Sequence, residues 1–212
     1  MKKVLFIMVL ALNLCWGSGT NVQAQGYFNF GYGLGVNFTS YDGVIKPGYA
    51  NPNEQITLSG KFTKVNVVYV PRYQFLQLKD DFGLGVASYI EAGMSFYTVN
   101  ETGKNAINDA WDNSRTGFQF GIPLLVEAAY GAGATEDSDQ SFGLFVGGGV
   151  DIHYNVTKDS DGIPGFVYGP TVGGGIRFGI VDNYMSIRTA YSIPMVDHWK
   201  NQFTVQVLFH FY

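Results

Sequence analysis

Cysteine is almost absent from the chain, and its single copy, Cys15, lies in the N-terminal segment. The rest of the chain has no thiol for a disulfide, a thiolate metal site or a cysteine nucleophile. Charge is scarce too, with only 14% of residues charged and a net charge of −4. Domains that bind nucleic acid carry a basic excess, so no nucleic-acid partner is expected.

Long apolar runs are also missing. A membrane-spanning helix needs about 20 apolar residues, whereas the run from Val4 to Trp16 has 13. Two lysines precede this run, and Val22-Gln23-Ala24 follows it as a V-x-A cleavage site. These features predict a cleavable signal peptide over residues 1–24 and a mature domain over 25–212. The leucine before Cys15 argues against lipidation, which needs a small residue there.

Aromatic residues (16%) and glycine (28 residues) are abundant, and they follow a strict alternation in the stretch 27–38. Phe28, Phe30, Tyr32, Leu34, Val36 and Phe38 alternate with Tyr27, Asn29, Gly31, Gly33, Gly35 and Asn37. A strand sends successive side chains to opposite faces, so this stretch predicts a strand with one apolar face and one small or polar face.

The same alternation recurs along the chain. It predicts eight strands, at residues 27–38, 56–75, 83–99, 116–130, 141–154, 166–180, 184–194 and 203–211. The connections after odd-numbered strands are mostly longer than those after even-numbered strands. The order is therefore that of an all-β, up-and-down antiparallel sheet in one domain.

The composition of the two faces favours lipid over water outside the sheet. A soluble sandwich or lipocalin would carry Lys, Glu and Thr on its outer face. Here the polar face is mostly Gly, Ala, Ser and Asn, which suits the narrow interior of an eight-stranded barrel. The apolar face is rich in Phe and Tyr, as in transmembrane barrels. We therefore predict a monomeric, eight-stranded transmembrane β-barrel in a bacterial outer membrane, with periplasmic termini, surrounded by lipid and lipopolysaccharide.

Three segments carry a resemblance to a known family. They are Ala24-Gln25 at the predicted cleavage site, Phe120-Gly121-Ile122-Pro123-Leu124-Leu125-Val126, and the closing Phe209-His210-Phe211-Tyr212. Together they resemble the small outer-membrane β-barrel domain proteins of Bacteroidetes-type bacteria, which are similar in architecture to OmpX- and OmpA-type barrels. The resemblance implies a fold and no activity. It also implies that the barrel-assembly machinery reads the C-terminal strand from Phe203 to Tyr212. In such signals the final residue is usually an aromatic residue on the lipid face, whereas the alternation in this chain places Phe211, one residue before the last, on that face.

Charged residues on the polar face are the first candidate site. They are Arg72, Glu91, Glu127, Asp151, Arg177 and Arg188. They could line an ion path, or they could pair into a structural plug that fills the lumen, and we favour the plug because charges in a narrow barrel must pair. Glu127 is expected to bridge at least two of the arginines.

The sequence motifs that could indicate nucleotide binding, calcium binding or catalysis are each incomplete. Gly31-x-Gly33-x-Gly35 lies within a strand with no helix after it, so it is not a nucleotide loop. Asp159-Ser160-Asp161-Gly162 lacks the distal Glu of a calcium loop. The Asp197-His198 pair could activate water but has no convincing serine partner. No catalytic residue, metal or cofactor is therefore expected.

The predicted function is that of a non-enzymatic barrel whose loops bind or adhere, or whose body supports the envelope. Tyr41, Tyr49 and Trp111 are the expected loop contacts, because aromatic residues dominate recognition hot spots. One alternative is a small channel or porin-like carrier for hydrophobic or small polar solutes. The other is a lipid-modifying or proteolytic outer-membrane enzyme.

Overall fold

The structure, a computed structural model, describes residues 26–45, 56–79, 81–102, 114–135, 138–157, 165–180 and 183–211. The strands are β1 (Tyr27–Ile45), β2 (Ile56–Lys79), β3 (Phe82–Ser88), β4 (Ile90–Thr102), β5 (Ser114–Gly121), β6 (Leu124–Gly131), β7 (Phe142–Thr157), β8 (Phe166–Ile180), β9 (Asn183–Ser192) and β10 (Gln202–Phe211). The predicted signal peptide lies outside the described residues. No helix among these ranges is long and apolar enough to cross a membrane.

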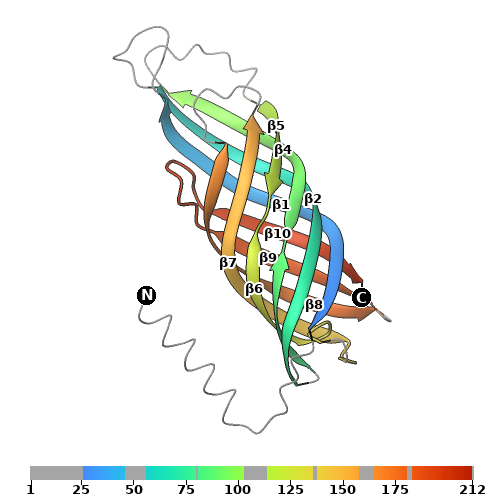
Figure 1. Cartoon of the computed structure of the whole chain (residues 1–212). Coiled ribbons are helices and arrows are strands. Elements are labelled where there is room, and N and C mark those ends of the chain that lie inside the picture. Colours follow the sequence, from blue (N-terminus) through green and yellow to red (C-terminus); the bar gives the residue numbers. More distant parts are fainter. Residues whose placement is uncertain are drawn as a thin grey trace, which may run out of the picture.

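The sheet closes on itself. Every pairing is antiparallel, and β1 pairs with β2 on one side and with β10 on the other. The tilted strands wrap around one axis (Figure 1). The pairing of the first and last strands extends from the pair Phe30–Phe211 to the pair Phe38–Phe203. Since each strand has two neighbours, the described part of the chain forms a closed barrel without an edge strand.

The ten segments amount to eight strands. β3 and β4 continue each other in one register against β2, and β5 and β6 do so against β7. The interruptions, at Tyr89 and at Ile122-Pro123, lie beside prolines that donate no ladder hydrogen bond. The prediction of an eight-stranded, up-and-down antiparallel barrel is therefore confirmed.

The two faces of the barrel have inverted polarity. Side chains such as Leu34 and Val67 point outward and are 64% and 62% exposed, whereas Arg72 and Arg177 point inward and are each 1% exposed. The alternation is clear in β6 and β10, where exposed and buried residues follow one another. Apolar residues therefore form the outer wall, and most buried residues of the lumen are polar or charged.

The strands extend further than the alternation predicted. β1 pairs with β2 up to Ile45, seven residues beyond Phe38, where the predicted strand ends. The prediction that Tyr41 is a loop residue is wrong. Its side chain points inward and is 3% exposed, and its backbone forms a bridge with Trp199. Gly43, which lies beyond the predicted strand end at Phe38, is buried and belongs to β1.

Candidate functional site

The lumen is filled by side chains in successive layers, which can be followed along the inward-facing residues of β2. These residues are, in order, Phe62, Lys64, Asn66, Val68, Val70, Arg72 and Gln74. We call the barrel end near Gln74, where β1 begins and β10 ends, the floor, and we call the end near Phe62 the cap.

The cap is an aromatic cluster inside the barrel. Tyr41, Phe62, Tyr97, Val167 and Trp199 are all buried and pack together. The Phe62 and Tyr97 rings stack with centroids 4.9 Å apart, and the Trp199 ring lies 5.0 Å from that of Phe62. The segment between β9 and β10 delivers Trp199 to this cluster, held by a hydrogen bond from the Lys200 amide to the Ser40 carbonyl.

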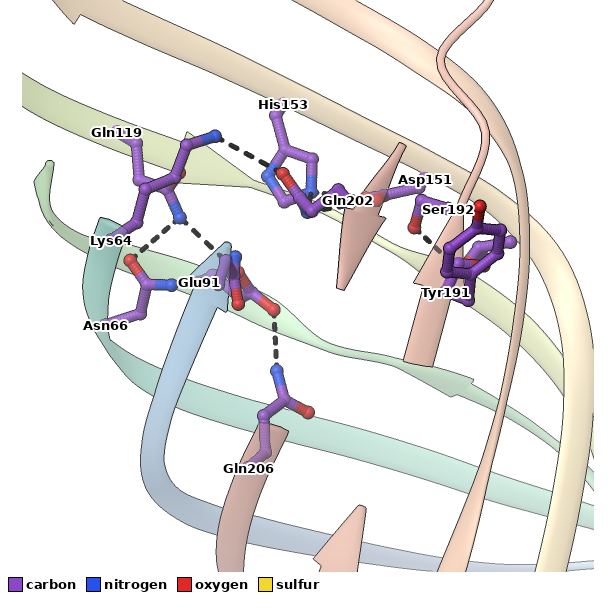
Figure 2. A network of polar contacts seen from close by, with 12 residues as sticks. Lys64, Asn66, Glu91, Gln119, Asp151, His153, Tyr191, Ser192, Gln202 and Gln206 are labelled. Atoms are coloured by element: carbon purple, nitrogen blue, oxygen red, sulfur yellow. Dashed lines mark hydrogen bonds and ion pairs between the residues drawn. The ribbon is translucent and has the colours of Figure 1, made fainter. Parts of the chain in front are cut away.

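Below the cap lies a polar group that joins three strands, β2, β7 and β10 (Figure 2). The Asp151 carboxylate lies 2.6 Å from His153 Nε2, and Gln202 Nε2 lies 3.0 Å from the same nitrogen. Lys64 Nζ donates to Gln202 Oε1 at 3.3 Å and also lies 5.5 Å from the Trp199 ring. The group therefore connects the charged interior to the aromatic cap.

Glu91 occupies the next layer and is surrounded by side-chain amides. Gln206 donates to Glu91 Oε1 at 2.6 Å, and Asn37 and Asn66 donate to Oε2 at 2.7 and 3.2 Å. Gln119 approaches the same oxygen at 3.5 Å and bonds Asn66. Figure 2 shows Gln119 and Gln206 approaching the Glu91 carboxylate from different strands. Neutral donors from β1, β2, β5 and β10 thus supply the hydrogen bonds that a buried carboxylate needs.

An apolar layer separates this carboxylate from the floor. It consists of Val68, Val70, Ala87, Tyr89, Leu125 and Leu208, each at most 2% exposed. Tyr89 connects the polar groups on both sides of the layer. Its hydroxyl donates to Glu127, and the Arg188 guanidinium lies 3.8 Å above its ring.

Glu127 is the centre of the floor. Its Oε2 lies 3.4 Å from Arg72 Nε and 3.5 Å from Arg177 Nη2, and all three side chains are buried. Arg188 does not join them, because its Nη1 donates to Gln206 Oε1 at 2.7 Å. Glu127 therefore contacts two of the three arginines that the sequence suggested.

The turn after β6 folds into the lumen and completes the floor. Its residues 131–135 are all buried. The Gly133 carbonyl accepts hydrogen bonds from Arg72 Nη1 at 3.0 Å and Arg177 Nη1 at 2.9 Å, and Gln74 donates to the Ala134 carbonyl. Gly131 and Gly133 have φ of 74° and 64°, which glycine adopts without strain. The turn thus acts as a backbone ligand for two guanidinium groups.

Little free volume remains between these layers. A crevice beside Asp151, His153, Ser192 and Gln202 offers about 10 Å³ for the centre of a water-sized sphere, which is about the space of one water molecule. The space beside Glu91, Arg188 and Thr204 offers none. Neither of these two spaces, beside Asp151 and beside Glu91, has room for a solute larger than a water molecule.

All six charged residues chosen from the sequence are buried in the lumen, in separate groups. Arg72, Glu127 and Arg177 meet at the floor, Arg188 lies beside Tyr89, Glu91 lies among the amides, and Asp151 meets His153. Sequence reasoning missed Lys64, Tyr89 and the Gly133 carbonyl. The parity of β2 could have found Lys64, which shares a face with Asn66 and Arg72.

The remaining candidates lie at the cap end or outside the described residues. The His198 ring lies 3.1 Å from the Asp42 backbone oxygen, and Asp197 is exposed beside it. Tyr49, Trp111 and Asp159 to Gly162 are outside the described residues. Within the described ranges, no group of three or more His, Cys, Asp or Glu side chains is placed to hold a metal ion.

Comparison with known proteins gives structural similarity only. No family model and no curated protein matches the chain. Ail, the attachment invasion locus protein of Yersinia pestis, solved with the heparin analogue sucrose octasulfate, is 11% identical, with a TM-score of 0.40 over 86% of this chain and 99% of that one. Neisserial surface protein A is 10% identical, with a TM-score of 0.42 over 88% of this chain and 97% of that one. Neither similarity assigns a ligand or an activity.

Proposed function

We propose that the chain is an integral outer-membrane β-barrel protein, non-enzymatic, with a lumen filled by side chains and with extracellular loops that bind, adhere or support the envelope. The observation that carries the proposal is the inverted polarity of a closed barrel. Apolar side chains cover the outer wall, while arginines and carboxylates are buried inside.

Exposure of this apolar outer wall to water would be energetically unfavourable. Taking one large apolar side chain out of water stabilises a protein by about 1.5–3 kcal/mol. Five side chains of the wall, Phe28 on β1, Val67 on β2, Met94 on β4, Phe118 on β5 and Val146 on β7, are each more than half exposed on the outside. Monomeric soluble proteins rarely expose apolar patches larger than a few hundred Å². A lipid bilayer removes this cost, and a closed barrel leaves no backbone edge unpaired within it.

The bacterial outer membrane is the compartment that fits a cleavable signal followed by such strands. The resemblance of the Phe120–Val126 and Phe209–Tyr212 segments to small Bacteroidetes-type barrels supports the same compartment. In this proposal the floor faces the periplasm, together with both termini, and the cap faces outward. The barrel-assembly machinery would read β10, whose Phe211 points outward.

The contents of the lumen argue against the channel alternative. A solute moving along the axis would have to pass the aromatic cap, the Glu91 amides, the apolar layer and the Glu127 floor, all of which are buried. The connections at the cap end, which include residues 46–55 and 103–113, are then the surfaces left for recognition. Tyr49 and Trp111 remain the proposed anchors there, whereas the buried side chain of Tyr41 is not available.

Membrane fractionation tests the proposal. The mature protein should sediment with outer membranes, require detergent for extraction, and migrate differently on gels with and without boiling because a closed sheet resists detergent. Recovery of a monomeric protein from the periplasm without detergent would exclude the membrane assignment.

A further inference from the structure

Three prolines stand in hydrogen-bonding positions of the barrel wall. They are Pro71 in β2, Pro123 between β5 and β6, and Pro170 in β8. Proline donates no hydrogen bond, so in sheets it is found at edges, strand starts or bulges. The described barrel has no edge strand, and the registers continue past each proline without a bulge. Each proline therefore removes one ladder hydrogen bond.

The bond directions show which carbonyls lose their donors. The Tyr89 amide donates to the Pro123 carbonyl at 2.8 Å. In an antiparallel ladder the reverse bond would run from residue 123 to the Tyr89 carbonyl, but Pro123 has no N–H. Successive residues bond to opposite sides, so Ser88 faces β2, where the continuing register places Pro71 opposite it. The Ser88 carbonyl loses its ladder donor in the same way.

Two consecutive residues of one strand thus lose a ladder bond, one on each side. Pro170 removes a single donor, opposite the Ile193 carbonyl on another part of the wall, because the Ile193 amide donates to Pro170. By contrast, β9 and β10 pair over nine positions from Gln202–Ser192 to His210–Tyr184 without a proline.

We propose that the wall has a built-in lateral seam at Ser88–Tyr89, which opens locally while the rest of the barrel stays closed. On its inner side lie Ala87 and Tyr89, which belong to the apolar layer with Val70 and Leu125. Opening at this point separates β3 from β2 and β6, so it is directed sideways through the wall and not along the barrel axis. The inference depends on the closed sheet and not on its location in a membrane.

The opening would also reach the lumen network through one side chain. The Tyr89 hydroxyl donates to Glu127, and its ring lies under the Arg188 guanidinium. Movement of the Tyr89 backbone therefore loosens the contacts on both sides of the apolar layer together. Because of this coupling, opening of the seam would change the packing of the lumen as well as the local hydrogen bonding.

Amide hydrogen exchange, followed by mass spectrometry on the full mature chain in lipid nanodiscs, tests the seam. Amides of Ser88, Tyr89 and Ile90 should exchange faster than those in the middle of β9 and β10. The double variant Pro71→Ala/Pro123→Ala restores both donors. Because one hydrogen bond contributes modestly to stability, exchange at the seam should slow by about twofold to tenfold per restored bond.

Pro170→Ala is the matched control, since it restores a donor opposite Ile193 and should leave exchange at Ser88–Ile90 unchanged. The proposal is overturned if these amides exchange no faster than β9 and β10. It is also overturned if the double variant leaves their exchange unchanged, or if Pro170→Ala slows it equally. Should the double variant fail to fold, the single variants and the wild-type comparison with β9 and β10 decide the matter.

Discussion

The two buried glutamates of the lumen are accommodated by different means. Glu127 contacts two guanidinium groups and a phenol, whereas Glu91 accepts hydrogen bonds from neutral amides. The cost of burying a charge falls only where partners satisfy it. Substitution of Glu127 leaves two buried cations without their carboxylate, and this defines the first prediction.

Glu127→Ala should lower the free energy of unfolding in detergent by about 3–5 kcal/mol, the usual cost of removing one partner from a buried ion pair. Arg72 and Arg177 would then keep only the Gly133 carbonyl as a common acceptor. Denaturant titration measures the change. Asp197→Ala, which removes an exposed carboxylate at the cap end, is the control and should have little effect. Similar small losses in both variants would show that the floor is hydrated.

The second prediction concerns glycine where β1 pairs with β10. A Cβ added at Gly33 would lie 1.9 Å from the Val207 carbonyl oxygen, whereas one added at Gly148 meets nothing closer than the Thr171 oxygen at 3.7 Å. Gly33→Ala should therefore cost about 1–3 kcal/mol or more through overpacking of the closing strands. Gly148→Ala should be neutral or slightly stabilising. Gel mobility without boiling reports how much of each variant closes, and equal folded fractions would contradict the prediction.

For single residues, the sequence predicts whether a side chain faces the lumen better than it predicts which side chains that residue contacts. Strand parity is enough to send Arg72, Glu127 and Arg177 inward, because period two is a property of any strand. Which arginine meets Glu127 depends on register and barrel stagger, which involve residues far apart in the chain. Parity alone could not show that Arg188 bonds Gln206, or that a glycine carbonyl completes the floor.

Among the elements, the turn after β6 departs most from a simple strand connection. Its sequence includes Glu136, Asp137 and Asp139, a composition typical of a solvent-exposed turn, yet residues 131–135 are buried within the lumen. The small side chains of the Gly131–Thr135 stretch allow the backbone to enter a space too narrow for larger residues. Composition therefore showed that this segment is a turn, but only the three-dimensional arrangement showed that it closes the barrel.

Gly133→Ala tests the turn as a structural element. Gly133 has φ of 64°, and a Cβ there would lie 2.6 Å from the Tyr184 ring. A left-handed conformation costs a non-glycine residue about 1–2 kcal/mol, and the contact with the ring adds to this. We expect a loss of at least that size in a denaturant titration. Ala132→Gly, one residue earlier in the turn, should cost less, and an equal loss would mean that flexibility of the turn, not its φ at Gly133, sets stability.

Strand lengths were the less predictable part of the elements. The alternation predicted a strand that ends at Phe38, but β1 continues to Ile45 because it pairs with β2 throughout. At the prolines, two sequence signals disagree about whether a strand is present. Pro71, Pro123 and Pro170 would normally argue against central strands, while alternation argued for them. Alternation was the better guide because a closed sheet holds its register through neighbours on both sides.

For the whole molecule, the layered lumen predicts that the purified protein does not conduct ions. Cap, amide layer, apolar layer and floor lie in series along the axis, so each would have to open for a continuous path. In planar bilayers the wild-type protein should show no steady conductance. The variant Phe62→Ala/Trp199→Ala removes two cap rings that lie 5.0 Å apart, and it should stay non-conducting because the three deeper layers remain. Steady conductance of the wild-type protein would contradict the filled lumen. Conductance of the variant alone would mean that the cap is the only barrier and that the deeper layers are hydrated.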